Sequence, residues 1–196
     1  MPSASTTGSS TPGIEMAKDL IIALLDADRH DRIAFDCGEP ALNDYLQKTA
    51  RRHLQKGIAN TYVLVRRDDP RNILGFFTLS FLEVDLSEIP PQYGKALPNT
   101  HLPAAKLGRL AIDKRCQGNN YGRLLLVDAI RRVANAIRNA AGVVGMFVDA
   151  KSPSVPAFYR KFGFIPLEDN PRSLMLPHQT ILAVFPEGET GQGIES

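Results

Sequence analysis

The sequence has no apolar run that approaches the length of a membrane helix, and it has only two cysteines among 196 residues. A helix that crosses a bilayer needs about 20 consecutive apolar residues, so we expect no membrane span. Cys37 and Cys116 are too few and too far apart for a disulfide framework. The first residues also lack the basic start and apolar core of a secretory signal. Together these absences indicate that the protein functions in the reducing environment of the cytoplasm.

Both ends of the chain hold few residues that could be buried. Residues 1–17 are rich in Ser, Thr, Gly and Pro, and residues 186–196 are acidic and poor in large apolar side chains. Such compositions cannot bury enough surface to fold alone. We therefore expect two flexible tails around one domain, residues 18–185, which has an ordinary length for a single core.

The formal net charge is only +2, which by itself predicts no polyanionic partner. The distribution of charge is uneven, because the segment from Tyr45 to Arg67 has six basic residues and no acidic one. A basic body with an acidic tail can present a positive face although the total is nearly neutral.

The apolar periodicity predicts an α+β domain, an α/β mixed sheet flanked by helices. Helices are expected after Pro40, near Arg123 and over Pro153–Phe162, and the proline-rich segment Pro90–Pro103 is expected to be an irregular loop. The strands are expected at Leu20–Leu25, Thr61–Val65, Ile73–Leu82, Lys106–Asp113, Val143–Val148, Phe164–Ile165 and Gln179–Val184.

A strand, a glycine-containing turn and a long helix follow one another after Lys106. The turn is Q-G-N-N-Y-G, residues 117–122, and three bases lie around it: Lys114, Arg115 and Arg123. Backbone N–H groups in such a turn point outward, and the helix dipole favours negative charge, so this arrangement can hold phosphate. Taken alone, the pattern fits an ordinary strand–helix turn equally well.

Three motifs together resemble the GNAT N-acetyltransferases: L-G-R-L-A-I-D (107–113), Q-G-N-N-Y-G-R-L-L (117–125) and A-F-Y-R-K-F-G-F (157–164). The resemblance runs from about Leu20 to Val184. It implies the GNAT fold, with a mixed sheet of six to seven strands flanked by about four helices. It also implies acetyl-CoA as acetyl donor, whose pantetheine arm would lie between the diverging strands Leu107–Asp113 and Val143–Asp149.

The resemblance also implies which residues contact acetyl-CoA. Asn120 stands where the family expects a glycine, and asparagine tolerates left-handed backbone better than most residues. Ser152 stands where many relatives have asparagine, and it can still donate a hydrogen bond. The full implied set is Leu110, Ala111, Ile112, Gln117, Gly118, Asn119, Asn120, Tyr121, Gly122, Arg123 and Ser152.

Tyr159 matches the tyrosine that acts as general acid in this family. A phenol with the usual pKa of about 10 is protonated at neutral pH, as a proton donor must be. The alternative for Tyr159 is simple aromatic packing, as expected for Phe158 and Phe162. A backbone N–H around Leu110–Ile112 would stabilise the oxyanion. The sequence singles out no general base, and its four histidines have no metal-ligand spacing, so we predict no metal.

Residues 35–46, F-D-C-G-E-P-A-L-N-D-Y-L, resemble the opening of GNAT toxins from bacterial toxin–antitoxin pairs. This implies acetylation of the α-amine of aminoacyl-tRNA, a ribbon-helix-helix antitoxin and a homodimer. Lys and Arg side chains hold nucleic-acid phosphates, although a solvated helix face has the same composition. The candidate tRNA contacts are Lys48, Arg51, Arg52 and Lys56.

Two other functions remain open at this point. One is a stand-alone acetyltransferase for a small amine or a protein N-terminus. The other is a GNAT module that binds a partner without turnover, for which Asn120 and Ser152 are the departures from the family pattern.

Overall fold

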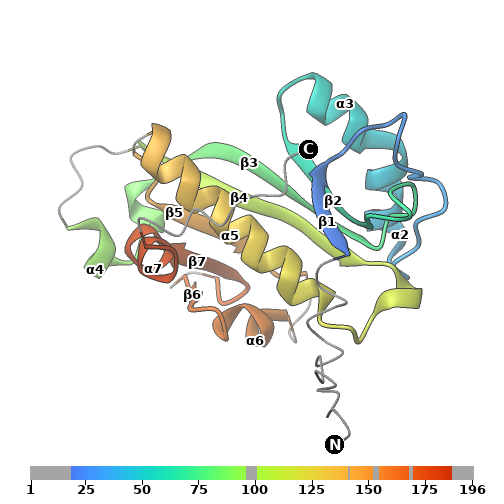
Figure 1. Cartoon of the computed structure of the whole chain (residues 1–196). Coiled ribbons are helices and arrows are strands. Elements are labelled where there is room, and N and C mark those ends of the chain that lie inside the picture. Colours follow the sequence, from blue (N-terminus) through green and yellow to red (C-terminus); the bar gives the residue numbers. More distant parts are fainter. Residues whose placement is uncertain (1–18, 96–100, 141, 152–154, 168–169, 187–196) are drawn as a thin grey trace, which may run out of the picture.

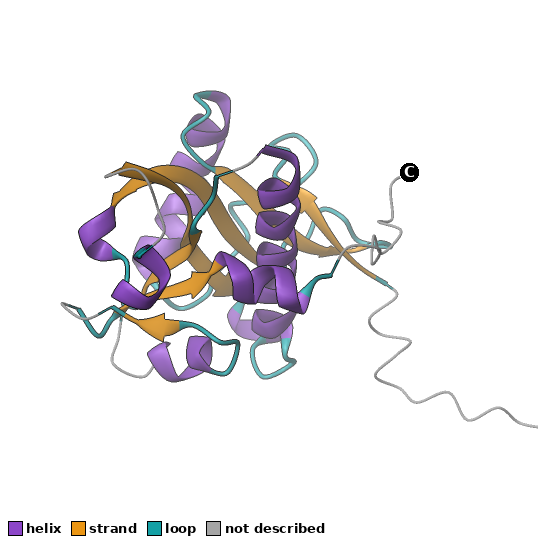
Figure 2. Ribbon diagram, turned by 90° about the vertical axis from the view of Figure 1, so that its left-hand side faces the viewer, coloured by secondary structure: helices purple, strands orange, loops and turns teal. Residues whose placement is uncertain are grey.

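A seven-stranded mixed sheet with helices on both faces makes up the protein (Figures 1 and 2). The computed structural model describes residues 19–95, 101–140, 142–151, 155–167 and 170–186. The strand order is β1-β2-β3-β4-β5-β7-β6, and every neighbouring pair is antiparallel except β4 and β5, which are parallel. The strands are β1 (Leu20–Leu24), β2 (Asn60–Arg66), β3 (Gly75–Asp85), β4 (His101–Ile112), β5 (Gly145–Asp149), β6 (Ile165–Pro166) and β7 (Ser173–Pro177).

The helices differ greatly in length, and α5 is by far the longest at 20 residues. In the described part of the chain, no helix combines the length and apolarity that crossing a membrane requires. The α-helices are α2 (Pro40–Asp44), α3 (Ala50–Gln55), α4 (Pro91–Gly94), α5 (Tyr121–Ala140), α6 (Val155–Arg160) and α7 (His178–Val184). A π-helical turn, η1 (Tyr45–Thr49), and two 3₁₀ turns, η2 (Leu86–Glu88) and η3 (Lys114–Cys116), complete them.

Successive side chains of β2 and β3 point to opposite faces of the sheet, so the hydrophobic core is divided between the two faces. Leu64 and Phe77 pack with α5 on one face, which we call the α5-side core. Their neighbours Val63 and Phe76 pack with η1 and α3 on the other face, the α3-side core. On α5 the apolar side chains buried against the sheet include Leu125, Leu126, Ala129, Ile130 and Val133, which share one helical face.

The segments α2, η1 and α3 follow one another without a break, so the chain is helical from Pro40 to Gln55 with a π-helical turn in the middle. The apolar residues Leu42, Leu46, Ala50 and Leu54 recur every four residues along this segment. A spacing of four is longer than the 3.6 residues of an α-helical turn, and the π-helical turn at Tyr45–Thr49 accommodates it. Leu46 and Ala50 are fully buried as a result, and Gly57 follows the segment with a positive φ of 66°.

The prediction of a strand at Gln179–Val184 is wrong, because His178–Val184 is the helix α7. The strand that occupies the sheet is the preceding segment Ser173–Pro177, which pairs with both β5 and β6. A short apolar run fits either structure, and here Ile181 is buried against the α5-side core. Arg138 of α5 donates a hydrogen bond to the Phe185 carbonyl and ties the end of α7 to that core.

The prediction of an irregular loop over Pro90–Pro103 is also wrong at its two ends. Pro91–Gly94 forms the short helix α4, and β4 begins at His101 rather than at Lys106. Residues 96–100 lie outside the described part of the chain. Pro103 lies within the strand, where its carbonyl accepts a hydrogen bond from the Val144 N–H (2.9 Å).

Candidate active site

The parallel strands β4 and β5 pair over only three residues and then separate. Their last paired positions are Leu107 and Val148. Beyond them β4 remains paired with β3 as far as Ile112, and β5 remains paired with β7 as far as Asp149. The predicted divergence of these strands is therefore confirmed. It leaves β4 without a β5 partner from Gly108 onward, so its backbone groups on that side are open to a ligand.

A β-bulge lies where the two strands separate. Leu79 pairs with Leu107 and Thr78 pairs with Arg109, so Gly108 is an extra residue on β4. A Cβ atom at Gly108 would lie 2.9 Å from the hydroxyl oxygen of buried Thr78, which explains the glycine.

The bulge shifts the alternation of side chains along β4 by one residue, so odd-numbered residues face the α5-side core before it and even-numbered residues face that core after it. Before it, Ala105 and Leu107 pack in the α5-side core. After it, Leu110 and Ile112 pack against that same core, whereas Ala111 joins the α3-side core. The three β4 residues predicted to contact acetyl-CoA thus lie on alternate faces, and only their backbone forms a common edge toward the gap.

The loop between β4 and α5, residues 113–120, has the backbone shape that the sequence suggested. Gly118 has a φ of 85° and Asn120 a φ of 61°, and Asn120 is the one non-glycine residue with positive φ in the described chain. Its left-handed conformation is therefore confirmed. The loop leads into the N-terminus of α5, whose unpaired N–H groups favour an anion.

A hollow of about 260 Å³ lies at this loop. Asn119 is not among the lining residues, and its side-chain amide donates to the Cys116 carbonyl (3.0 Å). Ser152 lies outside the described residues. The hollow is lined by Ile112, Cys116, Gln117, Gly118, Asn120, Tyr121, Gly122, Arg123 and Phe158, which brings together seven of the predicted contacts.

Two of the three bases beside the loop are paired with acids of the protein itself. Lys114 lies 2.5 Å from Asp36, and Arg115 lies 2.8 Å from the buried carboxylate of Asp113. Arg123 makes no ion pair with any described residue. An anion in the hollow would therefore meet backbone N–H groups and Arg123 rather than a cluster of three free cations.

Tyr159 lies on α6 and is only 6% exposed. Its ring packs edge-on against Phe158 (centroids 5.2 Å apart) and in a tilted arrangement against Phe164 (5.4 Å). Burial raises the pKa of Tyr159 to about 12, because removal from water disfavours the phenolate. Phe158 also lines the hollow, so this aromatic group links the α5-side core to the loop.

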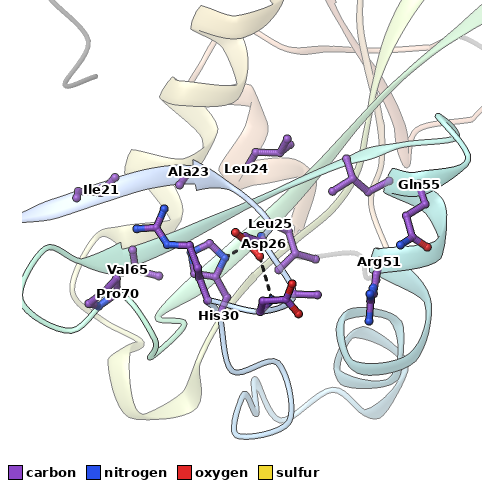
Figure 3. Close-up of a pocket in the computed structure, with 14 residues that line it drawn as sticks. Ile21, Ala23, Leu24, Leu25, Asp26, His30, Arg51, Gln55, Val65 and Pro70 are labelled. Atoms are coloured by element: carbon purple, nitrogen blue, oxygen red, sulfur yellow. Dashed lines mark hydrogen bonds between the residues drawn. The ribbon is translucent and has the colours of Figure 1, made fainter. Parts of the chain in front are cut away.

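The four predicted tRNA contacts are all exposed on η1, α3 and the residue that follows α3. Lys48 lies 2.7 Å from Asp44, so part of its charge is already balanced. Arg51 is one of the residues that line a second, larger hollow of about 510 Å³ between α3, β1 and the segment after β1 (Figure 3). There His30 accepts a hydrogen bond from the Asp26 N–H (2.9 Å), and burial lowers the pKa of His30.

Sequence reasoning missed the residues that support the loop. Asp36 forms hydrogen bonds with Asp113 and Lys114 at the start of the loop, and Asn43 bonds the Asp36 carboxylate from within the N-terminal segment. The contacts of Asp36 with the loop join positions 77 and 78 residues apart in the chain, and no local periodicity reports such a contact. No cluster of three or more His, Cys, Asp or Glu side chains suited to a metal occurs among the described residues.

The comparisons with protein families and with curated proteins agree with each other. A family model described as acetyltransferase (GNAT) domain matches residues 59–166. The chain is 30% identical over 173 residues to a probable toxin TacT of Sinorhizobium fredii, covering 84% of this chain and 94% of that protein. It is 34% identical over 150 residues to a tRNA-acetylating toxin of Mycobacterium tuberculosis, covering 76% and 87%.

Solved structures of the toxin AtaT share the fold. AtaT complexed with acetyl-methionyl-tRNAfMet superposes with a TM-score of 0.78 at 34% identity, covering 85% of this chain and 99% of AtaT. A tyrosine-to-phenylalanine mutant of AtaT, bound to the C-terminus of the antitoxin AtaR and to acetyl-CoA, gives a TM-score of 0.73 at 32% identity, covering 86% and 99%.

Proposed function

The chain belongs to the GNAT acetyltransferase family, and we propose that it is a toxin that acetylates the α-amine of aminoacyl-tRNA. The observation that carries this proposal is the separation of β4 from β5, with the left-handed residues of the loop that follows β4. Phe158, which packs against Tyr159, lines the hollow at that loop. The similarity to TacT, to the tRNA-acetylating toxin and to tRNA-bound AtaT supports the choice of acceptor.

The residues around the gap fit acetyl-CoA, which supplies the acetyl group as an activated thioester. The unpaired edge of β4 at Leu110–Ile112 would bind the pantetheine arm through its backbone. The pyrophosphate would be held by N–H groups of Gln117 to Gly122 and by the guanidinium of Arg123, because the left-handed residues turn successive N–H groups outward. Asn119 would contribute its backbone alone, since its amide is bonded within the loop. Ser152 is kept as a proposed contact.

Tyr159 is the proposed general acid. It holds its proton on the phenol oxygen through the whole neutral range, because its pKa is raised to about 12 by burial. It would give that proton to the sulfur that departs when the acetyl group is transferred. Backbone N–H groups near Leu110–Ile112 would stabilise negative charge on the acetyl oxygen. A free α-amine has a pKa of about 7.7, so a useful fraction is neutral without a dedicated base.

The exposed bases Lys48, Arg51, Arg52 and Lys56 are the proposed tRNA contacts. Arg51, Arg52 and Lys56 form no ion pair with any described residue. Their charges are therefore available to phosphates, whereas the charge of Lys48 is shared with Asp44. A long polyanion can be bound by such a local patch although the net charge of the chain is only +2.

An antitoxin partner and a homodimer complete the proposal. AtaT has been solved with its antitoxin AtaR, and the F-D-C-G segment resembles toxins that ribbon-helix-helix antitoxins neutralise. An enzyme that consumes aminoacyl-tRNA would act in the cytoplasm. The homodimer and the ribbon-helix-helix type rest on the family resemblance.

The acceptor is tested by transfer of radiolabelled acetyl from acetyl-CoA into bulk charged tRNA. We expect label on charged tRNA and none on uncharged tRNA, because only the charged form carries an α-amine. Equal labelling of both pools would contradict the proposed acceptor. Absence of label on charged tRNA, with acetyl-CoA binding intact, would redirect the search to small amines and protein N-termini.

Replacement of Tyr159 by Phe tests the acid. We expect Tyr159→Phe to lower kcat about 100-fold or more, since a positioned acid contributes about 10² to 10⁴. Acetyl-CoA affinity, measured by calorimetry, should change little, because the ring that packs against Phe158 and Phe164 is retained. The matched control is Tyr93→Phe, which removes the hydroxyl of a half-buried tyrosine on α4 in a different hydrophobic cluster. An unchanged kcat would exclude Tyr159 from this role.

Arg51→Gln and Arg52→Gln, made singly and together, test the tRNA patch. Each should lower kcat/KM for charged tRNA and reduce the slope of log K against log salt by about 1. Lys95→Gln, which removes an exposed charge at the end of α4, is the control. A double variant with the wild-type salt slope would show that these arginines only form a solvated helix face.

The toxin and dimer are tested in cells and in solution. Induction of the chain alone should arrest bacterial growth, and induction of Tyr159→Phe should not, because the arrest requires turnover. Sedimentation at micromolar concentration should give twice the monomer mass. Normal growth with active protein present would contradict the toxin, and a purely monomeric sample would contradict the dimer.

A further inference from the structure

A turn in the N-terminal part of the chain, residues 36–43, contacts the beginning of the β4–α5 loop. We call it the Asp36 turn. It contains the Asp, Cys and Gly of the F-D-C-G motif, to which the proposed chemistry assigns no task. Tyr159 and the exposed bases of α3 make no described hydrogen bond to it.

Asp36 joins the first two residues of the loop by three hydrogen bonds. Its N–H donates to the Asp113 carboxylate (3.2 Å), and its carbonyl accepts from the Lys114 N–H (2.8 Å). Its own carboxylate accepts from the Lys114 ammonium (2.5 Å). Two of the three bonds use the backbone, so they fix the path of the chain and not merely a side chain.

The carboxylate of Asp36 is held from its other side by the turn itself. It accepts from the Gly38 N–H (2.9 Å) and from the Asn43 amide (2.8 Å). The oxygen of the Asn43 amide in turn accepts from the Cys37 N–H (2.9 Å). The Lys114 ammonium, the Gly38 N–H and the Asn43 amide together hold the pKa of Asp36 well below its usual range. The carboxylate is therefore charged and fixed at neutral pH.

Gln117 makes the second connection, from the middle of the loop. Its side-chain amide donates both to the Cys37 carbonyl (3.1 Å) and to the Ile112 carbonyl (3.2 Å). The side chain thus points back to the turn and to the end of β4. The stretch from Ile112 to Gln117 is clamped at both ends, immediately before the left-handed residues Gly118 and Asn120.

We propose that Asp36, Asn43 and Gln117 are positioning residues that hold the β4–α5 loop in the shape that binds the pyrophosphate of acetyl-CoA. The identity of the ligand rests on the proposed function. An exposed loop with two left-handed residues loses conformational freedom when it binds, and a clamp on its first half reduces that loss beforehand. Lys114 and Asp36 are both largely exposed, so their ion pair adds little stability and acts by position.

The test compares Asp36→Asn with Glu39→Gln. Both remove one negative charge from the same turn, but the Glu39 side chain makes no described hydrogen bond to the loop. We expect Asp36→Asn to raise both the Kd and the KM for acetyl-CoA about tenfold. Its kcat at saturating acetyl-CoA and its KM for charged tRNA should stay within about twofold of wild type. Glu39→Gln should match wild type in all four quantities.

Asn43→Ala provides a second measurement, because it removes the amide that holds the Asp36 carboxylate and the Cys37 N–H at a position outside the predicted acetyl-CoA contacts. It should also raise the Kd for acetyl-CoA, and it decides the matter if Asp36→Asn does not fold. Wild-type affinity in the folded variants, or a loss of kcat with unchanged affinity, overturns the inference and leaves the proposed function in place. Failure of the wild-type chain to bind acetyl-CoA in the same calorimeter overturns the proposed function and the inference together.

Discussion

The separation of β4 from β5 after Leu107 is the constraint on which the rest of the site depends. Two strands can leave each other inside a sheet only when each keeps its other neighbour, and here β3 and β7 supply those neighbours. The bulge at Gly108 lies at the point of separation. Backbone groups freed in this way need a polar partner, so an opening in the sheet is a natural place for an extended, hydrogen-bonding ligand.

The mixed sheet with flanking helices could be predicted from the sequence, and the position of the gap followed from the family resemblance that the strand, turn and aromatic motifs carry. Local signals also served for Asn120, since few residues accept a left-handed backbone. They failed at Gln179–Val184, where a short apolar run fits a strand as well as a helix. Only the pairing of β7 with β5 and β6 decides between them.

The partners of the side chains around the loop could not be predicted, because several of them lie far away in sequence. Lys114 stands beside a phosphate-type loop, and in the folded chain it pairs with Asp36, 78 residues away. Arg115 pairs with Asp113, which is close in sequence, but local spacing does not show that this pair forms. The contacts of the F-D-C-G motif could not be predicted for the same reason. The motif is distinctive in the sequence, but Asp36 bonds residues 77 and 78 positions away. Gln117 likewise turned out to bond the Asp36 turn with its side chain.

The two proposed sites would recognise their anions in different ways. At the β4–α5 loop, Gly118, Asn120 and Arg123 line the hollow. At α3 the bases Arg51 and Arg52 stand free of ion pairs with described residues. Side-chain cations displace counterions from a polyanion, so that surface should respond steeply to salt. Backbone N–H groups in a preformed loop carry no net charge and depend instead on geometry. Affinity for acetyl-CoA would then be controlled by the shape of the loop, and affinity for tRNA by the ionic strength.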